Sequence, residues 1–342
     1  MKLTLTLMLT EVAMSRVTLR DVAERANVSV NTVSRALNDK SGVSGETRKR
    51  IMEIAEELGY TQNLVARGLV TQSTNVIGVV VSDNVNPYFS EVIQGISLVT
   101  QARGLTQLLV NTWFSRSAER EAVNTLVQHR VDGLILFPLD WSQVDEYLRY
   151  RLPMVCVGAI PPNAPEKPLD VVAPDDYGGT TEAIEYLIRA GRKRIAYCGP
   201  GEDSISGIHR WNGYEKAIEA AGLQPIFIRL EANTFDAYKL GLSADQFQDV
   251  DAVFAFNDMI AIGLLRAFGE RGIRVPTDIA LVGYDDIQLA RYLTPALTTV
   301  RIPKAELGRQ AATLLIQRMG GDFLHRSVER LLPTELIVRE TA

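Results

Sequence analysis

Two short amphipathic helices joined by a tight turn can be read in residues 18–37, and this pair constrains the fold more than any other feature. Thr18 and Asp21 have the spacing of a capping box at the start of the first helix. Apolar residues then recur with a helical period, at Leu19, Val22, Ala23 and Ala26. Residues 27–29 break this pattern, and Ser29 is a suitable cap for a second helix. We therefore predict a helix-turn-helix.

The second helix has an apolar inner face and an outer face of different character. The inner face consists of Val33, Ala36 and Leu37. The outer residues are small, or carry an amide or guanidinium group: Val30, Asn31, Ser34, Arg35 and Asn38. Such side chains on an exposed helix suit the reading of base edges in a major groove. The alternative is an ordinary helical hairpin whose polar face contacts only water.

A third helix completes a small basic headpiece. It is expected to begin at residues 44–47 and to stop at Gly59, with a buried stripe of Ile51, Ile54, Ala55 and Leu58. Between Arg16 and Arg50 there are eight basic and four acidic residues, whereas the whole chain has a net charge of −5. This local excess of positive charge favours a module that faces a polyanion.

The headpiece closely resembles the lactose-repressor (LacI/GalR) family of bacterial transcription regulators. The matching runs are residues 17–23, 27–38, 43–48 and 58–60. The resemblance implies that Val30, Asn31 and Arg35 read base edges in the major groove. It implies contacts to DNA phosphates for Ser29, Thr32, Ser34, Asn38, Ser44 and Thr47, and adds Thr18 and Leu19 to the DNA-binding set. Hydroxyl and amide groups at helix N-termini suit such phosphate contacts.

Residues 63–69 are too few for a stable helix alone, and Gly68 costs about 1 kcal/mol relative to Ala in a helix interior. We expect this segment to be disordered by itself. In the family, the matching segment is a hinge helix that folds on operator DNA, pairs with its dimer mate and inserts a leucine into the minor groove. The resemblance gives that role to Leu69, with Ala66 facing the groove. The alternative is a plain polar linker over residues 61–74.

From residue 75 the sequence alternates strand-like apolar runs with helical patterns. The strand-like runs are 76–81, 108–110, 133–137, 154–157, 194–198, 252–255 and 279–282. The helical patterns are 87–103, 118–130, 177–190, 210–221 and 259–271. Strands separated by crossover helices form parallel sheets covered on both faces. Residues 250–257 echo residues 131–138, which indicates two similar lobes with a ligand cleft between them.

The expected fold class is α/β, with a three-helix helix-turn-helix headpiece and a two-lobed core of doubly wound parallel sheets. The family resemblance implies that this core is periplasmic-binding-protein-like (type I). We expect a disordered extension (1–14), the headpiece (15–61), a hinge helix and linker (62–74), and an effector-binding and dimerisation core (75–342). Within the core, the expected N-lobe covers about 75–173 and 302–322, and the expected C-lobe covers about 174–301 and 323–342.

The resemblance also implies a set of effector-binding residues at strand ends and helix starts. Tyr88 and Phe89 would supply aromatic surface, and hydrogen bonds would come from Asp175, Ser204, Ser206, Arg210, Asn257 and Asp285. Aromatic faces and hydrogen-bonding groups together suit a sugar, sugar acid or polyol. Purine-binding relatives have an arginine where this chain has Ser204, which favours sugars over purines. Individually, Asp285 and Asp286 could cap a helix, Arg210 could form a surface ion pair, and the aromatic residues could belong to the core.

Several function classes are disfavoured by the sequence. The three histidines lack zinc or triad spacing, and no glycine-rich phosphate loop occurs, so we expect no enzyme, metal or cofactor. Cys156 and Cys198 lie in apolar runs and are expected to be reduced core residues. No run is long enough to span a membrane, and residues 1–10 do not resemble a signal peptide. A cytoplasmic location is therefore expected, with translation starting at Met1 or Met14.

Two hypotheses about function remain after these exclusions. The first is a transcriptional regulator, expected to be a repressor, that binds a palindromic operator as a homodimer and responds to an effector in the cleft. The alternative is a sugar-binding receptor or transport component with a helical extension. The helix pair and the missing signal peptide favour the regulator. A dimer is expected because residues 337–342 contain no heptad run of the kind that makes some relatives tetrameric.

Overall fold

The computed structural model describes residues 17–61, 73–162, 164–165, 168–201, 204–230, 234–243, 246–321 and 327–342. The chain divides into two compact units after Gln72. The expected extension and most of the expected hinge, including Ala66 and Leu69, lie outside the described residues. Ser73 and Thr74 were expected in the linker, yet both donate hydrogen bonds to the Asp132 carboxylate and thereby belong to the core.

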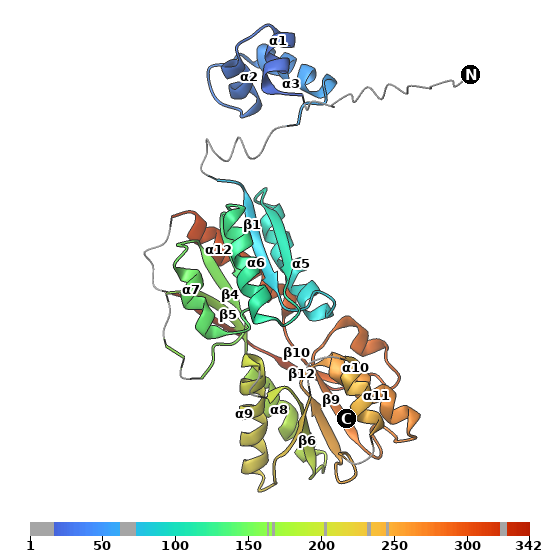
Figure 1. Cartoon of the computed structure of the whole chain (residues 1–342). Coiled ribbons are helices and arrows are strands. Elements are labelled where there is room, and N and C mark those ends of the chain that lie inside the picture. Colours follow the sequence, from blue (N-terminus) through green and yellow to red (C-terminus); the bar gives the residue numbers. More distant parts are fainter. Residues whose placement is uncertain are drawn as a thin grey trace, which may run out of the picture. The chain divides into compact units, whose positions relative to one another are not determined.

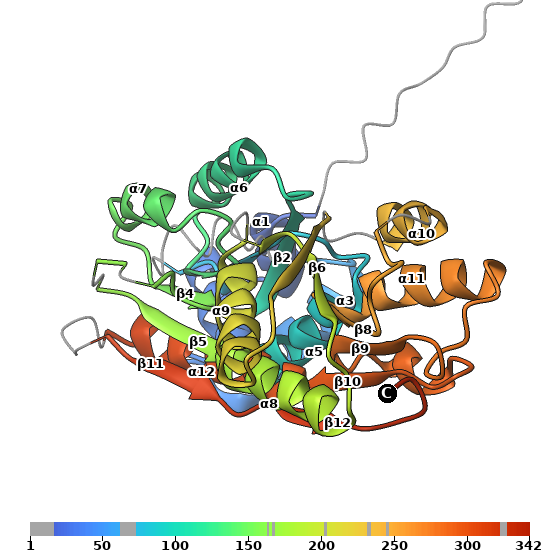
Figure 2. The ribbon, with the colours of Figure 1, turned by 90° about the horizontal axis from the view of Figure 1, so that it is seen from below.

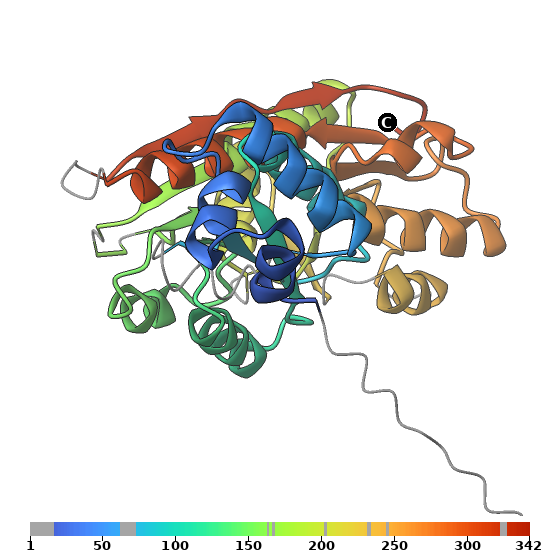
Figure 3. The same ribbon diagram turned by 90° about the horizontal axis from the view of Figure 1, so that it is seen from above.

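The first unit is a three-helix headpiece formed by α1 (Leu19–Ala26), α2 (Val30–Leu37) and α3 (Gly45–Glu57). Each helix begins at a hydroxyl cap, and the predicted capping box of Thr18 and Asp21 is present. Figure 3 shows the three helices beside one another. They pack around a buried cluster of Val22, Ala23, Ala26, Val33, Ala36, Ile51 and Ala55. Gly59 follows α3 with a φ of 66°, the left-handed conformation that ends a helix. The predicted helix-turn-helix is confirmed.

The N-lobe of the core is built on a six-stranded sheet in the order β11-β5-β4-β3-β1-β2, with every neighbouring pair parallel. Its strands are β1 (Val76–Val81), β2 (Thr106–Asn111), β3 (Gly133–Leu136), β4 (Met154–Val157), β5 (Asp170–Pro174) and β11 (Glu329–Leu332). Its helices are α5 (Pro87–Gln101), α6 (Arg116–Gln128), α7 (Val144–Leu148), α12 (Lys304–Met319) and the 3-10 turn η1 (Trp141–Gln143). Side chains of β1 are buried on both faces, as its continuous apolar run predicted.

The C-lobe repeats this plan with the sheet order β12-β10-β9-β8-β6-β7, in which only β12 is antiparallel to its neighbour. Its strands are β6 (Ile195–Gly199), β7 (Ile226–Arg229), β8 (Ala252–Ala255), β9 (Ala280–Asp285), β10 (Thr298–Arg301) and β12 (Glu335–Ile337). Its helices are α8 (Asp176–Arg189), α9 (Ile205–Ala220), α10 (Thr234–Leu242), α11 (Asp258–Glu270) and the 3-10 turn η3 (Gln288–Tyr292). Helices α8 and α9 lie side by side, as do α10 and α11 (Figure 2).

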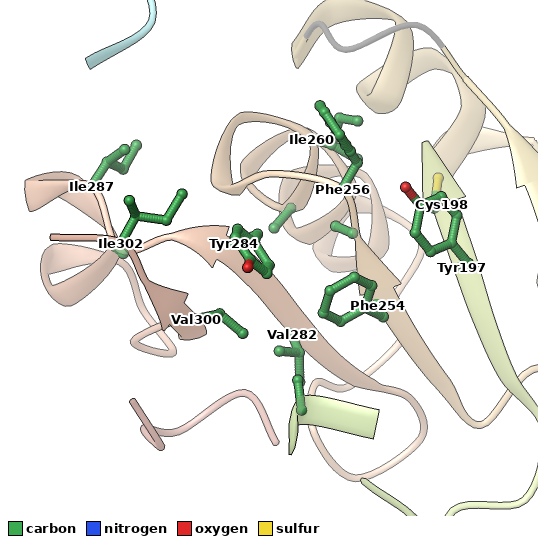
Figure 4. Close-up of a cluster of buried hydrophobic side chains, with 14 of the residues drawn as sticks. Tyr197, Cys198, Phe254, Phe256, Ile260, Val282, Tyr284, Ile287, Val300 and Ile302 are labelled. Atoms are coloured by element: carbon green, nitrogen blue, oxygen red, sulfur yellow. The ribbon is translucent and has the colours of Figure 1, made fainter. Parts of the chain in front are cut away.

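The central strands of the C-lobe carry its hydrophobic core. Tyr197, Phe254 and Tyr284 are fully buried on three neighbouring strands, with Val282 and Val300 packed nearby (Figure 4). Cys156 and Cys198 are buried within such apolar strands and are not joined in a disulfide, as the sequence predicted. This dense packing gives each strand end a fixed position, which matters for the site described below.

Within the described residues, the chain passes between the lobes three times, after β5, after β10 and after β11 (Figure 1). The expected boundary assigned all of residues 323–342 to the C-lobe. That assignment is wrong for β11, because Glu329–Leu332 pairs in parallel with β5 at the edge of the N-lobe sheet. Of the described residues after β11, the strand β12 belongs to the C-lobe sheet, where it pairs with β10.

Helices α5 and α12 of the N-lobe approach each other closely through glycine. A Cβ atom on Gly308 would lie 2.0 Å from the Val92 carbonyl oxygen, and one on Gly95 would lie 2.0 Å from the Ala305 carbonyl oxygen. Both neighbouring atoms belong to the backbone and cannot move aside as a flexible side chain could. The close contact therefore fixes the positions of α5 and α12 relative to each other. Tyr88 and Phe89 stand at the start of α5, so this contact also holds the predicted aromatic residues of the cleft.

Among the described helices, none is both long and apolar enough to cross a membrane.

Candidate functional site

The headpiece presents the N-terminal part of α2 to solvent. Val30 is 43% exposed and Asn31 is also exposed, whereas Val33 and Ala36 on the opposite face are buried. The outer face predicted for α2 is therefore accessible. Ser34, Arg35 and Asn38 on the same face are only partly exposed.

Two of the predicted DNA-binding side chains on α2 also make contacts within the headpiece. The Arg35 guanidinium donates from Nε to the Ser41 carbonyl oxygen at 2.9 Å, which folds the side chain towards the loop after α2. The Asn38 amide donates to the Ser34 carbonyl oxygen at 2.7 Å. A base contact by Arg35 would have to use donors beyond those held by this carbonyl.

The remaining predicted DNA-binding residues of the headpiece lie at helix starts. Thr18, Ser29 and Ser44 cap the three helices, and Leu19 is the first residue of α1. Ser29 and Thr32 are joined through their hydroxyl oxygens at 2.8 Å, and Ser44 donates to Thr47 at the same distance. Hydroxyl groups therefore gather at the N-termini of α2 and α3, where backbone N–H groups favour anions.

The basic character of the headpiece is partly internal. Arg48 donates hydrogen bonds to the carbonyl oxygens of Ala36 and Lys40 and pairs with Asp39 at 2.7 Å. Arg50 donates to the carbonyl oxygen of Ala26 at 2.7 Å. These two arginines hold the helices together, which a count of charges along the sequence does not show.

A cavity of about 640 Å³ lies between the two lobes of the core. Seven of the eight predicted effector-binding residues line it: Tyr88, Phe89, Ser204, Ser206, Arg210, Asn257 and Asp285. The fold brings them together because they follow strand ends or open helices, and the carboxyl ends of parallel strands meet at one edge. Ser204 and Asn257, for example, are the N-caps of α9 and α11.

Asp175 is the exception among the predicted effector-binding residues. Its carboxylate caps α8, accepting a hydrogen bond from the Gly178 N–H at 2.8 Å, and Asp175 is absent from the lining of the cavity. The next residue, Asp176, is buried and accepts a hydrogen bond from Arg210 at 2.9 Å. Neither aspartate lines the cavity, because the Asp175 side chain turns back to its own helix and Asp176 is taken up by Arg210. The effector contact of Asp175 stays a prediction.

Arg210 is the central charge of the cavity wall. Its side chain is 5% exposed, its Nε donates to Asp176 Oδ1, one terminal nitrogen donates to the Phe256 carbonyl oxygen, and the other lies 3.8 Å from Asp285 Oδ1. The guanidinium also lies over the Tyr284 ring, 3.7 Å from its centre. Burial alone would lower the pKa of Arg210, but the carboxylates of Asp176 and Asp285 raise it above its ordinary value.

Asp285 ends β9 in an unusual backbone conformation, with a φ of 111°, and Asp286 follows with a φ of 48°. Burial raises the pKa of Asp285 to about 7, although Arg210 and Lys304 lower it. The Lys304 ammonium donates to the backbone carbonyl oxygens of both aspartates, at 2.5 and 2.8 Å, and lies 3.4 Å from Glu91. The N-lobe helices α5 and α12 are thereby attached to the strand end that carries Asp285.

The two adjacent carboxylates have different partners, because β9 ends at Asp285 and the backbone turns at Asp286. Asp286 accepts hydrogen bonds from Arg339 at 2.5 Å and from Arg301 at 2.8 Å, away from the cavity lining. Burial would raise the pKa of Asp286, but these two arginines keep it below its ordinary value. Asp285 alone of the pair lines the cavity.

The cavity also has lining residues that the sequence analysis missed. Trp113, Phe114 and Arg116 follow the edge strand β2. Arg229 ends the corresponding edge strand β7, and Leu230 follows it. The signal for the first group was an aromatic pair directly after a strand-like run. It could have been recognised by the rule that ligands lie at the carboxyl ends of strands.

The donors in the cavity do not suit a metal ion. Among the residues that the structure describes, no group of three or more His, Cys, Asp or Glu side chains could hold one. The cavity combines six aromatic rings with a few hydrogen-bonding groups: Tyr88, Phe89, Trp113, Phe114, Phe137 and Phe256 supply the rings. Such a lining suits an organic ligand with apolar faces and hydroxyl groups.

Comparison with known proteins agrees with this organisation. The family described as bacterial regulatory proteins, lacI family, matches residues 18–63, and the periplasmic binding protein-like domain matches residues 184–342. The HTH-type transcriptional repressor PurR of Vibrio atlanticus (strain LGP32) is 32% identical over 334 residues, which cover 95% of this chain and 98% of that protein.

Two solved structures are similar over nearly the whole chain. The complex of the transcriptional regulator CelR with cellobiose is 31% identical, with a TM-score of 0.72, and covers 96% of this chain and 100% of that one. The Lac repressor dimer bound to operator and the anti-inducer ONPF is 29% identical, with a TM-score of 0.84, and covers 96% of this chain and 99% of that one. Both units of this chain are therefore present in its relatives.

Proposed function

Because this chain belongs to the lacI family of bacterial regulatory proteins, we propose that it binds a palindromic operator as a homodimer. Binding of a sugar in the cavity then lowers or raises its affinity for the operator. The observation that carries the proposal is that one chain holds both a helix-turn-helix with an exposed α2 and a lobed core with a lined cavity. Its relatives are transcription regulators, not enzymes or transport components. A regulator of bacterial DNA works where the chromosome lies, so we propose a cytoplasmic location.

Val30 and Asn31 are proposed to read base edges, because both are exposed at the N-terminal end of α2. An asparagine amide can bind adenine in a bidentate manner, and an apolar side chain can contact a thymine methyl group. Arg35 is proposed to read a neighbouring base from the next turn. The hydroxyl groups of Ser29, Thr32, Ser44 and Thr47 are proposed to contact phosphates, since they gather at helix N-termini.

A sugar or sugar derivative is proposed as the effector. The similar CelR structure is a complex with cellobiose, which is a sugar, and the cavity of this chain offers the chemistry that such a ligand needs. Arg210 and Asp285 together present donors and an acceptor to hydroxyl groups, and Tyr88 and Phe89 present aromatic surface. Ser204, in place of the arginine of purine-binding relatives, favours this class over purines.

Binding in the cavity is proposed to act on DNA through the orientation of the lobes. Asp285 lines the cavity, and Lys304 holds its carbonyl group to helices α5 and α12 of the N-lobe. A ligand that binds Asp285 therefore contacts the end of β9, which the Lys304 ammonium joins to the N-lobe. The N-lobe begins at Ser73, directly after the proposed hinge helix, so effector and operator would be linked thermodynamically.

The test starts with selection of a binding site from random DNA duplexes by the full-length protein. Asn31→Ala is the cleanest variant, because the Asn31 side chain is exposed and does not contribute to the headpiece core. We expect it to weaken binding to the selected site by about 1–3 kcal/mol and to relax the preference at one base pair, with little change on random duplexes. Arg35→Ala should behave in the same way. Equal losses on both DNAs would refute the reading role.

Arg48→Ala is a control for structural effects, not for phosphate contact. Because its guanidinium joins α3 to the loop after α2, we expect this variant to lower the melting temperature of the headpiece. Melting curves of all variants then separate lost DNA contacts from lost folding. Failure of the wild-type protein to enrich any palindromic site would contradict the proposed function itself.

A further inference from the structure

The cavity extends across more of the fold than a single sugar ring needs. In each lobe its lining comes from the ends of four adjacent strands, β4-β3-β1-β2 in the N-lobe and β9-β8-β6-β7 in the C-lobe. Neighbouring strands lie about 4.8 Å apart, so four strand ends span about 14 Å. The cavity volume of about 640 Å³ is correspondingly large.

The two ends of the cavity differ in character. The inner end, beside β8 and β9, holds the buried Arg210 with Asn257 and Asp285. The outer end, beside the edge strands β2 and β7, is lined by Trp113, Phe114 and Arg116 from one lobe and by Arg229 and Leu230 from the other. The buried charged groups therefore lie at the inner end, whereas the outer end has two largely exposed aromatic rings beside two arginines.

The aromatic pair at the outer end has a strained backbone conformation. Trp113 and Phe114 have φ angles of 51° and 56°, in the left-handed region that bulky side chains rarely adopt. The turn is fastened to the end of β1 by hydrogen bonds from the Thr112 N–H to the Val81 carbonyl oxygen at 2.9 Å and from the Phe114 N–H to the Ser82 carbonyl oxygen at 3.3 Å.

This turn does not bury the two rings. Trp113 is 66% exposed and Phe114 is 52% exposed, although both line the cavity. Packing in the core therefore does not account for two large apolar side chains in a strained turn. Strained residues of this kind cluster at ligand sites, where the surrounding structure holds them in place for binding.

We propose that the outer end is a second sugar subsite, so that the effector is a saccharide of at least two rings. The first ring is hydrogen-bonded at the inner end by Arg210 and Asp285, and the second ring packs its C–H face on Trp113 and Phe114. This inference rests on the proposed function, because it names the size of the sugar ligand that the regulator recognises. A rigid aromatic ring gives such a contact a large area at a small loss of side-chain freedom.

Matched pairs of sugars test the proposal by titration calorimetry on the full chain: glucose with cellobiose, galactose with lactose, and xylose with xylobiose. We expect at least one disaccharide to bind about tenfold or more tightly than its own monosaccharide. Trp113→Ala should remove that advantage while leaving monosaccharide binding within about twofold of the wild type. Phe114→Ala should reduce it in the same direction.

Phe235→Ala is the matched control, because Phe235 is an aromatic residue of similar exposure, 63%, on α10 and is not part of the cavity lining. It should leave the affinity for every sugar unchanged. Fluorescence gives a second readout, since Trp141 is buried and Trp113 is the most exposed of the three tryptophans. A stacked second ring should shift the emission of the wild type to shorter wavelength, and Trp113→Phe should lose this shift while keeping disaccharide affinity.

A monosaccharide that binds as tightly as its disaccharide would overturn the proposal, as would a disaccharide whose affinity survives Trp113→Ala. If no sugar of the three pairs binds, the two-ring effector is rejected. Operator selection, run in parallel without any sugar, tells these failures apart from a failure of the proposed function. A protein that enriches a palindromic site but ignores the disaccharides keeps its role in DNA binding and loses only the assignment of its effector.

Discussion

Replacing Arg210 with alanine tests whether the cavity wall depends on a compensated buried charge. The Arg210 guanidinium lies 2.9 Å from Asp176 Oδ1 and 3.8 Å from Asp285 Oδ1, and both carboxylate side chains are nearly inaccessible to water. The substitution removes the cation closest to both. Loss of one partner from a buried ion pair destabilises a protein by about 3–5 kcal/mol. Arg210→Lys should lose less, because the ammonium keeps the charge but not the planar fork.

The assay is thermal unfolding of the core, with and without the substitution. For a unit of this size, a loss of about 3–5 kcal/mol lowers the melting temperature by roughly 5–10 °C. Arg274→Ala is the matched control. Arg274 also pairs with an aspartate, Asp278 at 2.6 Å, but its side chain is 72% exposed. Exposed ion pairs contribute little to stability, so this variant should melt close to the wild type.

The pH dependence separates the effect of charge from the effect of lost packing. Without Arg210, the pKa of Asp285 rises beyond its wild-type position near 7, because a cation that lowered it is gone. A carboxyl group whose pKa is higher in the folded than in the unfolded state stabilises the fold at low pH. That stabilisation is lost as the pH rises through the folded pKa. The difference between Arg210→Ala and the wild type should therefore be larger at pH 8 than at pH 5.5.

Either of two results would refute this reasoning. One is a melting temperature of Arg210→Ala that matches the wild type at pH 8. The other is a deficit of the same size at both pH values, which would mean that lost packing rather than unpaired charge is responsible. The same variant should lose its response to effector, whereas operator binding without effector should persist because the headpiece is a separate unit.

Three further predictions follow from the core. Effector affinity should fall about tenfold between pH 8 and pH 6, because protonation of Asp285 removes an acceptor for sugar hydroxyl groups. Calorimetry across this pH range checks the prediction, and an affinity that does not change with pH would contradict it. Lys304→Met should leave effector affinity nearly intact but reduce the change in operator affinity on effector addition, since it cuts the contact between β9 and the N-lobe helices. Gly308→Ala should lower the unfolding free energy in urea titrations by about 1–3 kcal/mol or more, because its Cβ would meet the Val92 carbonyl oxygen at 2.0 Å. Gly269→Ala is the control, because this helical site has open space around it, and it should not lower the unfolding free energy.

The elements with strong apolar patterns were predictable from the sequence, and the weakly patterned ones were not. Strands β1 and β4 begin and end at the predicted residues because each is a continuous apolar run. Strand β7 was not predicted, since it lies at a sheet edge and is only partly buried, so its pattern is weak. Strand β11 was also not predicted, and its segment was assigned to the wrong lobe because no local pattern records which sheet a strand joins.

The candidate site shows the same division between local and long-range information. Its residues could be expected at strand ends, but Asp175 and Asp176 differ by only one position, and one step along a helix turns a side chain by about 100°. The structure gives Asp175 to the helix cap and Asp176 to Arg210. The contacts of Arg35 and Arg48 with backbone carbonyl groups could not be predicted either, because every residue has such a group and the sequence does not show which one an arginine binds.

The three crossings between the lobes also determine when each part of the protein can be finished during synthesis. A chain that has emerged from the ribosome as far as residue 301 holds β6 to β10 but not α12 or β11. The partner of α5 and the edge strand beside β5 are then still missing, so apolar surface of the first lobe remains uncovered. The headpiece has a wholly local core and can fold at once. We therefore expect the two lobes to be completed together, only after α12, β11 and β12 have emerged, and a chain halted with residue 301 just outside the ribosome to display an unfinished first lobe to chaperones.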